Sequence, residues 1–450
     1  MRSKMLTWLG GLSLFTLLAI PIRSGAQEQQ QQQQQAGRPH HYKVTDLGTL
    51  SGSYSEAFYM NNNGAIGGVS SRADGTEHAF LWKKAVMADL GTLGGANSIA
   101  FGGPNLWNQL VGQSDTAAED PNNEDFCGFG THHICRPFLW QPLPFERGVM
   151  LPLPTLGGHN GQADGINNLG EVVGTAENAT TDTSCPIGQT LHQFKPVTWS
   201  LGEIRELRTF SGDPDGVALG TNDYGDVVGT SGVCAPFNPN ISENLTALHA
   251  LLWHKGEMTD LGNLGGTGTN GGILAFNINN NSQVVGLSDI KGDASFHAFL
   301  WTSETGMQDL GMLSADDFGS SATGLDDKGN VVGLSIDATG TPHAFLRPNG
   351  GKMIDLNTLI PTDSPLFLFQ ACSINSRGEL TGLALETSTG DLHAFLAVPV
   401  DGDFDSESAA AAEQAGTSEP KHVVLTENVR KRLQQRLRFR LPGARPTDPQ

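Results

Sequence analysis

The sequence predicts an all-β protein, a seven-bladed β-propeller built from four-stranded antiparallel blades. Three observations support this fold class. A pattern with a period of about 51 residues recurs seven times, each copy contains four short apolar runs, and the first copy begins with the run that the last copy lacks. The composition agrees, because 57 of the 450 residues are Gly, 23 are Pro and only 16% are charged. Such a composition favours short strands and turns over long helices.

Each copy of the pattern predicts four strands separated by tight turns. The clearest copy has Asp-Leu-Gly at 260–262, Ala-Phe-Asn-Ile at 275–278, Val-Val-Gly at 284–286 and His-Ala-Phe-Leu-Trp at 297–301. Gly, Asn, Asp or Ser residues bound these runs, as expected for short strands. The Asp-Leu-Gly element, in full or degenerate form, begins at Asp46, Asp89, Pro152, Glu206, Asp260, Asp309 and Asp355.

The two ends of the repeat region predict how the ring closes. An Asp-Leu-Gly run at 46–48 precedes the first complete blade, whereas the last copy ends at His393-Ala394-Phe395 without one. If the N-terminal strand completes the last blade, no blade keeps an unpaired edge. The longest connections between second and third strands are predicted at 115–135, 177–194 and 232–248, and we expect function on the face that carries them.

The sequence outside the repeats predicts an exported chain with a short tail. Residues 1–26 have the basic start, apolar stretch and small residues of a cleaved signal peptide, with an uncleaved anchor as the alternative. A Gln-rich disordered spacer (27–41), the propeller (42–400), a linker (401–420) and a basic tail (421–450) follow. The mature protein is therefore predicted to be secreted or periplasmic, and a monomer.

Charge is unevenly distributed along the chain, and its distribution argues against nucleic acid as a partner. The net charge is −20, while residues 421–450 carry +6 and residues 27–420 carry −29. Such an acidic body should repel nucleic acid. In the tail, apolar residues recur every four positions from Leu425 to Leu441, which predicts a basic amphipathic helix. This helix has three alternatives: weak attachment to an anionic cell envelope, folding back onto the acidic body, or a solvated extension.

Five cysteines remain after the signal peptide, and export favours disulfides between them. Cys127 and Cys135 flank one predicted loop, and Cys185 and Cys234 lie in equivalent loops of neighbouring blades. Cys372, within an apolar strand-like run, is the cysteine left over. The first loop also holds His132 and His133, so a zinc site is the alternative there.

The repeated tripeptide resembles a known family, the bacterial extracellular proteins named for their His-Ala-Phe (HAF) repeats. The tripeptide occurs at 78–80, 297–299, 343–345 and 393–395 and alternates with runs such as Asp-Leu-Gly-Thr-Leu-Gly-Gly at 89–95. The resemblance covers residues 43–400, and three blades depart from it, at 136–138, 195–197 and 249–251. It implies an exported bacterial protein, and it supplies no catalytic residue, cofactor or substrate.

Most of the residues that attract attention have a structural interpretation. One histidine per blade begins the third strand, and in three blades it faces a serine of the second strand (Ser70 and His78, for example), which predicts cross-strand hydrogen bonds. These histidines are His78, His249, His297, His343 and His393. Trp residues at the end of the third strands are expected to pack between blades. They are Trp82, Trp140, Trp199, Trp253 and Trp301.

Three residues remain as candidate ligand contacts, namely Trp107, His132 and His133. Trp107 lies in a turn between first and second strands, on the face opposite the long loops. We find no catalytic, cofactor-binding or metal-binding motif. The sequence favours an extracellular binding module for a polymer or a protein, acting through the loop-rich face. The alternatives are a polysaccharide hydrolase or lyase, and a structural or adhesive envelope protein.

Overall fold

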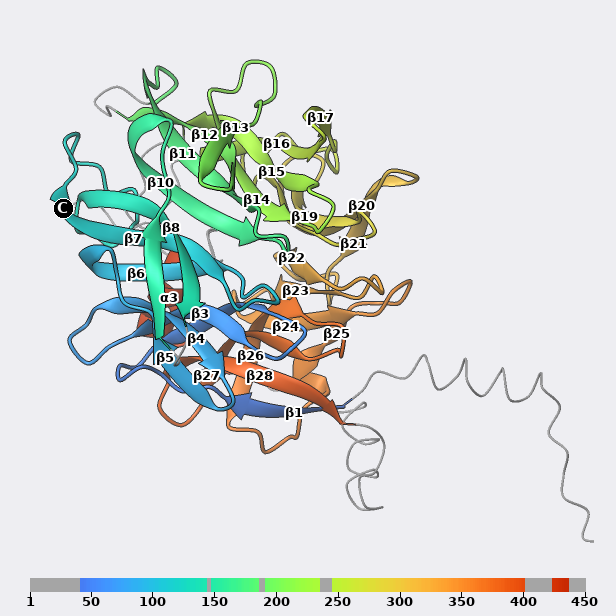
Figure 1. Ribbon diagram of the computed structural model, residues 1–450. Coiled ribbons are helices and arrows are strands. Elements are labelled where there is room, and N and C mark those ends of the chain that lie inside the picture. The colour runs from blue at the N-terminus through green and yellow to red at the C-terminus, as the bar shows by residue number, and fades with distance from the viewer. Residues whose placement is uncertain (1–40, 144–146, 186–190, 235–244, 401–422, 437–450) are drawn as a thin grey trace, which may run out of the picture. The chain divides into compact units, whose positions relative to one another are not determined.

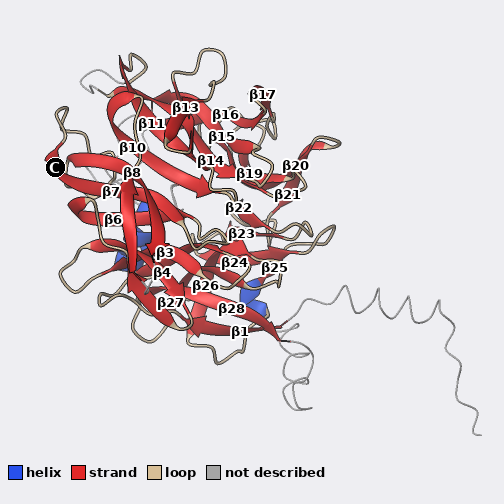
Figure 2. Ribbon diagram, in the orientation of Figure 1, coloured by secondary structure: helices blue, strands red, loops and turns tan. Residues whose placement is uncertain are grey.

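The computed structural model describes residues 41–143, 147–185, 191–234, 245–400 and 423–436. The predicted signal peptide, most of the Gln-rich spacer and the linker lie outside these residues. Within the described residues, 28 strands form seven four-stranded sheets, arranged as the blades of a ring (Figure 1). Among these described residues, helix is confined to η1 (Leu356–Thr358) and α3 (Glu427–Arg436) (Figure 2), and neither is long and apolar enough to span a bilayer. The predicted seven-bladed β-propeller is therefore confirmed.

Every blade is an antiparallel sheet whose first strand is the innermost. Blade 1 contains β2 (Ser55–Met60), β3 (Ile66–Ser71), β4 (Glu77–Lys83) and β5 (Val86–Asp89). Blade 2 contains β6 (Gly94–Gly102), β7 (Leu110–Glu119), β8 (His133–Leu143) and β9 (Arg147–Pro152). Blade 3 contains β10 (Gly157–Ile166), β11 (Val172–Thr181), β12 (His192–Ser200) and β13 (Glu203–Glu206).

The remaining blades follow the same order. Blade 4 contains β14 (Asp215–Thr221), β15 (Val227–Cys234), β16 (Leu245–His254) and β17 (Glu257–Asp260). Blade 5 contains β18 (Ile273–Ile278), β19 (Val284–Asp289), β20 (Phe296–Thr302) and β21 (Gly306–Gly311). Blade 6 contains β22 (Gly319–Leu325), β23 (Val331–Ile336), β24 (Pro342–Arg347) and β25 (Ile354–Asp355), and η1 (Leu356–Thr358) follows it.

The N-terminal strand closes the ring by completing blade 7. This blade contains β26 (Leu366–Ile374), β27 (Leu380–Glu386) and β28 (Leu392–Val400), with β1 (His41–Asp46) as its outer strand. β1 pairs antiparallel with β28, and Val44 lies opposite Ala397. Nδ1 of His393 donates to the Asp46 carboxylate at 2.8 Å, so a side-chain bond joins the two ends of the repeat region.

A bulge in each inner strand explains the Gly of the Val-Val-Gly run. In blade 5 the pairing of β18 with β19 shifts register between Ala275 and Asn277, directly opposite Gly286. A Cβ on Gly286 would lie only 1.9 Å from the carbonyl oxygen of Leu274. The same register shift occurs in the first hairpin of all seven blades. The glycine is therefore required by close backbone approach, not by turn formation.

Aromatic side chains of the third strands fill the space between blades. Phe299 is completely buried, and so are its counterparts in blades 1, 2, 6 and 7. Trp199 and Trp253 are 2% and 3% exposed, and their indole nitrogens donate to the carbonyl oxygens of Pro154 and Arg208. Both acceptors lie in the segment that crosses from the preceding blade, so the Trp residues join neighbouring blades, as their regular spacing predicted.

The Asn-rich turns between first and second strands form a chain of hydrogen bonds from blade to blade. The first Asn of each turn caps its own turn through Oδ1, and its Nδ2 donates to the matching carbonyl of the next blade. These bonds run from Asn61 to Asn105, Asn105 to Asn167, Asn167 to Asn222, Asn222 to Asn279, Asn279 to Asp326 and Asn375 to Asn61. Blade 6 has Asp326 at this position, and a carboxylate has no proton to donate. There Nζ of Lys328 donates to the Ser376 carbonyl instead.

Removing one link of this chain should be measurable. In Asn279→Asp the side chain still accepts from the turn but no longer donates to the Asp326 carbonyl at 2.9 Å. Asn279 is 5% exposed, so we expect the free energy of unfolding to fall by about 1–3 kcal/mol in urea titrations. Asn63→Asp, at an exposed position of the equivalent turn in blade 1, is the control, and an equal loss in both variants would contradict the proposed role of the buried donor.

The described part of the tail folds back onto the propeller. α3 (Glu427–Arg436) carries the helical pattern that the sequence predicted. Leu425, Val429 and Leu433 are buried in an apolar cluster with residues of blades 1, 2, 5, 6 and 7. Of the three alternatives for this segment, the structure therefore places it against the acidic body.

Candidate functional site

The candidate site lies on the face that carries the connections between second and third strands, which we call the loop face. In blades 2 and 3 these connections are residues 120–132 and 182–191, of which 186–190 lie outside the described residues. Both are shorter than predicted, because β7, β8, β11 and β12 extend into the predicted loops. The blade-to-blade crossings, such as residues 207–214, lie on the same face.

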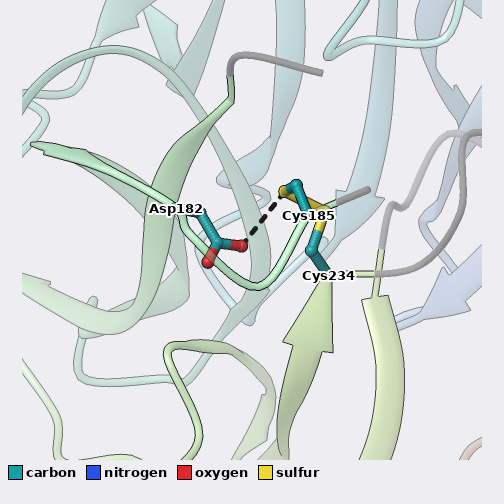
Figure 3. Close-up of side chains that lie close together, drawn as sticks. All are labelled: Asp182, Cys185 and Cys234. Atoms are coloured by element: carbon teal, nitrogen blue, oxygen red, sulfur yellow. Dashed lines mark hydrogen bonds between the residues drawn. A yellow bond between two sulfur atoms is a disulfide. The ribbon is translucent and has the colours of Figure 1, made fainter. Parts of the chain in front are cut away.

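Two disulfides fix these loops, as the sequence indicated. Cys127 in the first loop bonds to Cys135 in β8. Cys185 in the second loop bonds to Cys234 at the end of β15, which joins blade 3 to blade 4 (Figure 3). Cys372 is buried outside any disulfide, and burial raises the pKa of its thiol. Disulfides of this kind indicate an oxidising compartment, extracellular or periplasmic.

Asp182 lies directly beside the disulfide between the two blades. Its Oδ2 is 3.2 Å from the sulfur of Cys185 (Figure 3). The carboxylate and both sulfur atoms lie within 4.8 Å of one another, a spacing that would suit a metal ion. The sulfurs are bonded to each other, however, and a metal ligand must be a thiolate. The backbone N–H and hydroxyl of Ser184 bond this carboxylate at 2.8 and 2.9 Å instead.

Two buried pairs of carboxyl groups underlie the stapled loops. Burial, together with a hydrogen bond to Asp182 and the charge of Asp182, raises the pKa of Asp215 to about 8. Burial, together with a hydrogen bond to Glu177, likewise raises the pKa of Glu124 to about 9. Two adjacent carboxylates cannot both ionise cheaply in a low dielectric, so each pair holds a proton near neutral pH.

Asn160 of β10 fastens the first loop to the neighbouring blade. Its Nδ2 donates to Oδ2 of Asp120 at 2.9 Å and to Oε2 of Glu124 at 3.2 Å. Its Oδ1 accepts from the backbone N–H of Cys135 at 2.9 Å. The loop is therefore held by a disulfide and by buried polar contacts, so its exposed residues occupy defined positions.

The structure does not bring the three candidate ligand contacts together. His132 is exposed in the first loop and His133 begins β8; their Nδ1 atoms donate to the carbonyl oxygens of Asn123 and Thr116. Trp107 lies in the turn between β6 and β7, at the other end of the blade. It is 68% exposed, and its indole nitrogen donates to the Asn168 carbonyl at 3.1 Å.

Trp107 borders a hollow between blades 2 and 3 on the face opposite the loop face. The hollow has a volume of about 550 Å³. Its walls include Leu169 and Leu201, which are 79% and 102% exposed, and the side chains of Gln109 and Gln141. None of the described residues that line it is charged. A second hollow, of about 540 Å³, lies on the loop face beside Phe210 and contains Lys195 and Arg208.

The repeated histidines bond aspartates, not the serines that the sequence predicted. Ser288 does lie opposite His297, but Nδ1 of His297 donates to Asp309 of the fourth strand at 2.9 Å. The Ser288 hydroxyl instead accepts from the backbone N–H of Leu264 in the blade crossing at 3.0 Å. The same histidine–aspartate contact occurs in His78–Asp89, His343–Asp355 and His393–Asp46.

Blade 4 departs from this arrangement. Its histidine, His249, bonds Asp213 of the preceding crossing at 2.8 Å and stacks on Phe210 with ring centroids 3.8 Å apart. Asp213 also accepts the hydroxyl proton of Ser231 at 2.5 Å. A nucleophilic triad needs the serine bonded to the histidine, whereas here both side chains bond the aspartate, so the contacts stabilise the crossing.

Comparison with known proteins adds no family. No known family model matches the chain, and no curated protein matches it. Among solved structures, puromycin hydrolase is 12% identical with a TM-score of 0.40 and covers 79% of this chain. A prolyl endopeptidase structure is 11% identical with a TM-score of 0.41 and covers 84% of this chain. Dipeptidyl peptidase 4 of Porphyromonas gingivalis is 11% identical with a TM-score of 0.30 and covers 85% of this chain.

The chain spans about half the length of these solved proteins, with 56%, 55% and 46% of each covered. At such TM-scores the likeness carries no argument about function. The class of the protein thus follows from its own residues: it is a seven-bladed β-propeller with disulfide-fixed loops on one face.

Proposed function

We propose that this protein is an exported binding module that holds an extracellular polymer or protein on its loop face. One observation carries the proposal: two loops from neighbouring blades are fixed by disulfides and by buried polar contacts. Fixing a loop before binding lowers the conformational entropy that binding must overcome. The resemblance to the HAF-repeat proteins and the signal-like N-terminus support export.

The test is a pelleting assay with the mature chain (residues 27–450). The protein is incubated with insoluble bacterial cell wall and with plant and fungal polysaccharides, and both pelleted protein and released soluble sugar are measured. We expect pelleting without released sugar. Released sugar would contradict a pure binding function and favour the hydrolase or lyase alternative.

A matched pair of variants locates the binding surface. His132→Ala removes an exposed side chain of the loop face, and Trp107→Ala removes one from the opposite face. We expect the His132 variant to bind about tenfold more weakly, a loss typical of a contact within an interface. Trp107→Ala should bind as the wild type does, and the reverse result would move the binding site to the opposite face.

A further inference from the structure

The centre of the loop face is strongly apolar. Phenylalanine side chains from blades 1, 2, 5, 6 and 7 reach into one cluster there, and we call this surface the apolar mouth. Its defining residues are Phe58, Phe101, Phe129, Phe276, Phe318 and Phe369. The rings of Phe58 and Phe101 lie 5.5 Å apart. Phe129 belongs to the disulfide-fixed loop, so the apolar mouth adjoins the proposed binding surface.

The segment that begins α3 and the helix itself cover the apolar mouth with a narrow apolar stripe. Leu425, Val429 and Leu433 follow one another at four-residue intervals and are 9%, 4% and 0% exposed. They belong to the same cluster as the phenylalanines. This spacing is that of an amphipathic helix lying in a groove. The apolar mouth thus accepts a helix of this pattern.

Charge favours a basic helix in this position. Lys431 and Arg432 are exposed on α3, and Nη1 of Arg430 donates to the Thr339 carbonyl at 3.4 Å. Thr339 lies in the loop of blade 6 that also contains Asp337, and the corresponding loop of blade 7 contains Asp391. Residues 27–420 as a whole carry −29, so long-range attraction adds to the apolar contact.

The contact of α3 is of a kind that a competitor can replace. A ten-residue helix has little stability of its own in water. Its apolar contact rests on a short stripe, and residues 401–422 separate it from the last strand. Because α3 is tethered to the propeller, its high local concentration near the apolar mouth favours the contact more than its intrinsic affinity for that surface does. A second helix of the same pattern therefore competes for the same surface.

We propose that the apolar mouth is a docking site for a basic amphipathic helix of a partner protein, and that α3 occupies it until the partner binds. This inference rests on the proposed function only in placing binding on the loop face. It assigns the centre of that face to a protein ligand, whichever polymer or protein the surrounding loops hold.

The experiment uses the full chain and a fluorescent peptide of residues 423–436 as the probe. Val429→Asp with Leu433→Asp removes the apolar stripe of α3 and should free the mouth. We expect this variant to bind the peptide at least tenfold more tightly than the wild type does, because no tethered helix competes. A peptide carrying the same two substitutions should not bind, and Val424→Ala in the full chain, which removes a side chain that is 94% exposed, should behave as wild type.

Two results would overturn the proposal. One is a folded double variant, checked by thermal melting, that does not bind the peptide. The other is equal binding by the wild type and the double variant. If the double variant does not fold, hydrogen exchange on the wild type decides: excess peptide should speed amide exchange in residues 427–436, and unchanged rates would refute displacement. None of these readouts depends on polysaccharide pelleting, so the two proposals can fail separately.

Discussion

Tyr42→Ala is expected to lower the free energy of unfolding by about 3–4 kcal/mol, within the range for removing a large buried aromatic side chain. Tyr42 lies in β1, is 3% exposed, and packs in a cluster with Leu359, Ile360 and Phe395. Burial, with a smaller effect from the charge of Asp326, raises the pKa of its phenol to about 12. Because β1 is the outer strand of blade 7, losing its anchor weakens the closure of the whole ring.

The measurement is urea unfolding of the variant beside a matched control. Tyr224→Ala removes a tyrosine that is 72% exposed, and it should change the free energy of unfolding by less than about 0.5 kcal/mol. Opening blade 7 also exposes the edge of β28, so the Tyr42 variant should aggregate sooner on heating. If Tyr42→Ala lowers the free energy of unfolding by less than about 1 kcal/mol, the packing of β1 is not what stabilises the closure of the ring.

The fold could be predicted from the sequence because its determinants are local and repeated. Seven copies of the same four runs fix the strand order within each blade, and the displaced Asp-Leu-Gly run at Asp46 fixes the closure. The register between the second and third strands could also be predicted from the sequence, since Ser288 does lie opposite His297. The hydrogen-bond partner of His297 could not be predicted in this way. His297 donates to Asp309 of the fourth strand, and the pairing argument considered only the second and third strands.

The contacts of the candidate site join residues that no local pattern connects. The carboxyl pairs Asp182–Asp215 and Glu124–Glu177 each combine different blades, and so do the bonds between the Asn-rich turns. The repetition of Asn at the start of these turns was the one signal present, but it indicated turn geometry and not a bond to the next blade. The sequence left three alternatives for α3, and folding back onto the propeller was one of them. An amphipathic pattern shows that a helix has an apolar stripe, but it does not show which surface covers that stripe.

Asp215→Asn is expected to stabilise the protein at pH 8 and to flatten the dependence of its stability on pH. Asp215 is completely buried, and Oδ1 accepts from the backbone N–H of Phe194 at 3.1 Å. Its pKa is about 8 in the folded state and about 4 in an unfolded chain. The stability that its protonated form contributes is therefore fully present below pH 4 and is lost as pH rises to 8.

An amide at this position needs no proton from solution, because it can donate to Asp182 at any pH. Urea titrations between pH 4 and pH 9 should therefore show a gain on the order of a few kcal/mol for the variant at pH 8, shrinking towards pH 4. Asp363→Asn, at an exposed position, should leave the wild-type curve unchanged. Glu124, whose pKa is raised to about 9, should contribute to the slope that remains, so adding Glu124→Gln should reduce that slope further. A variant that is less stable than wild type at pH 8 would mean that the ionised Asp215 is stabilised by Lys195, and that a proton between Asp182 and Asp215 is not needed.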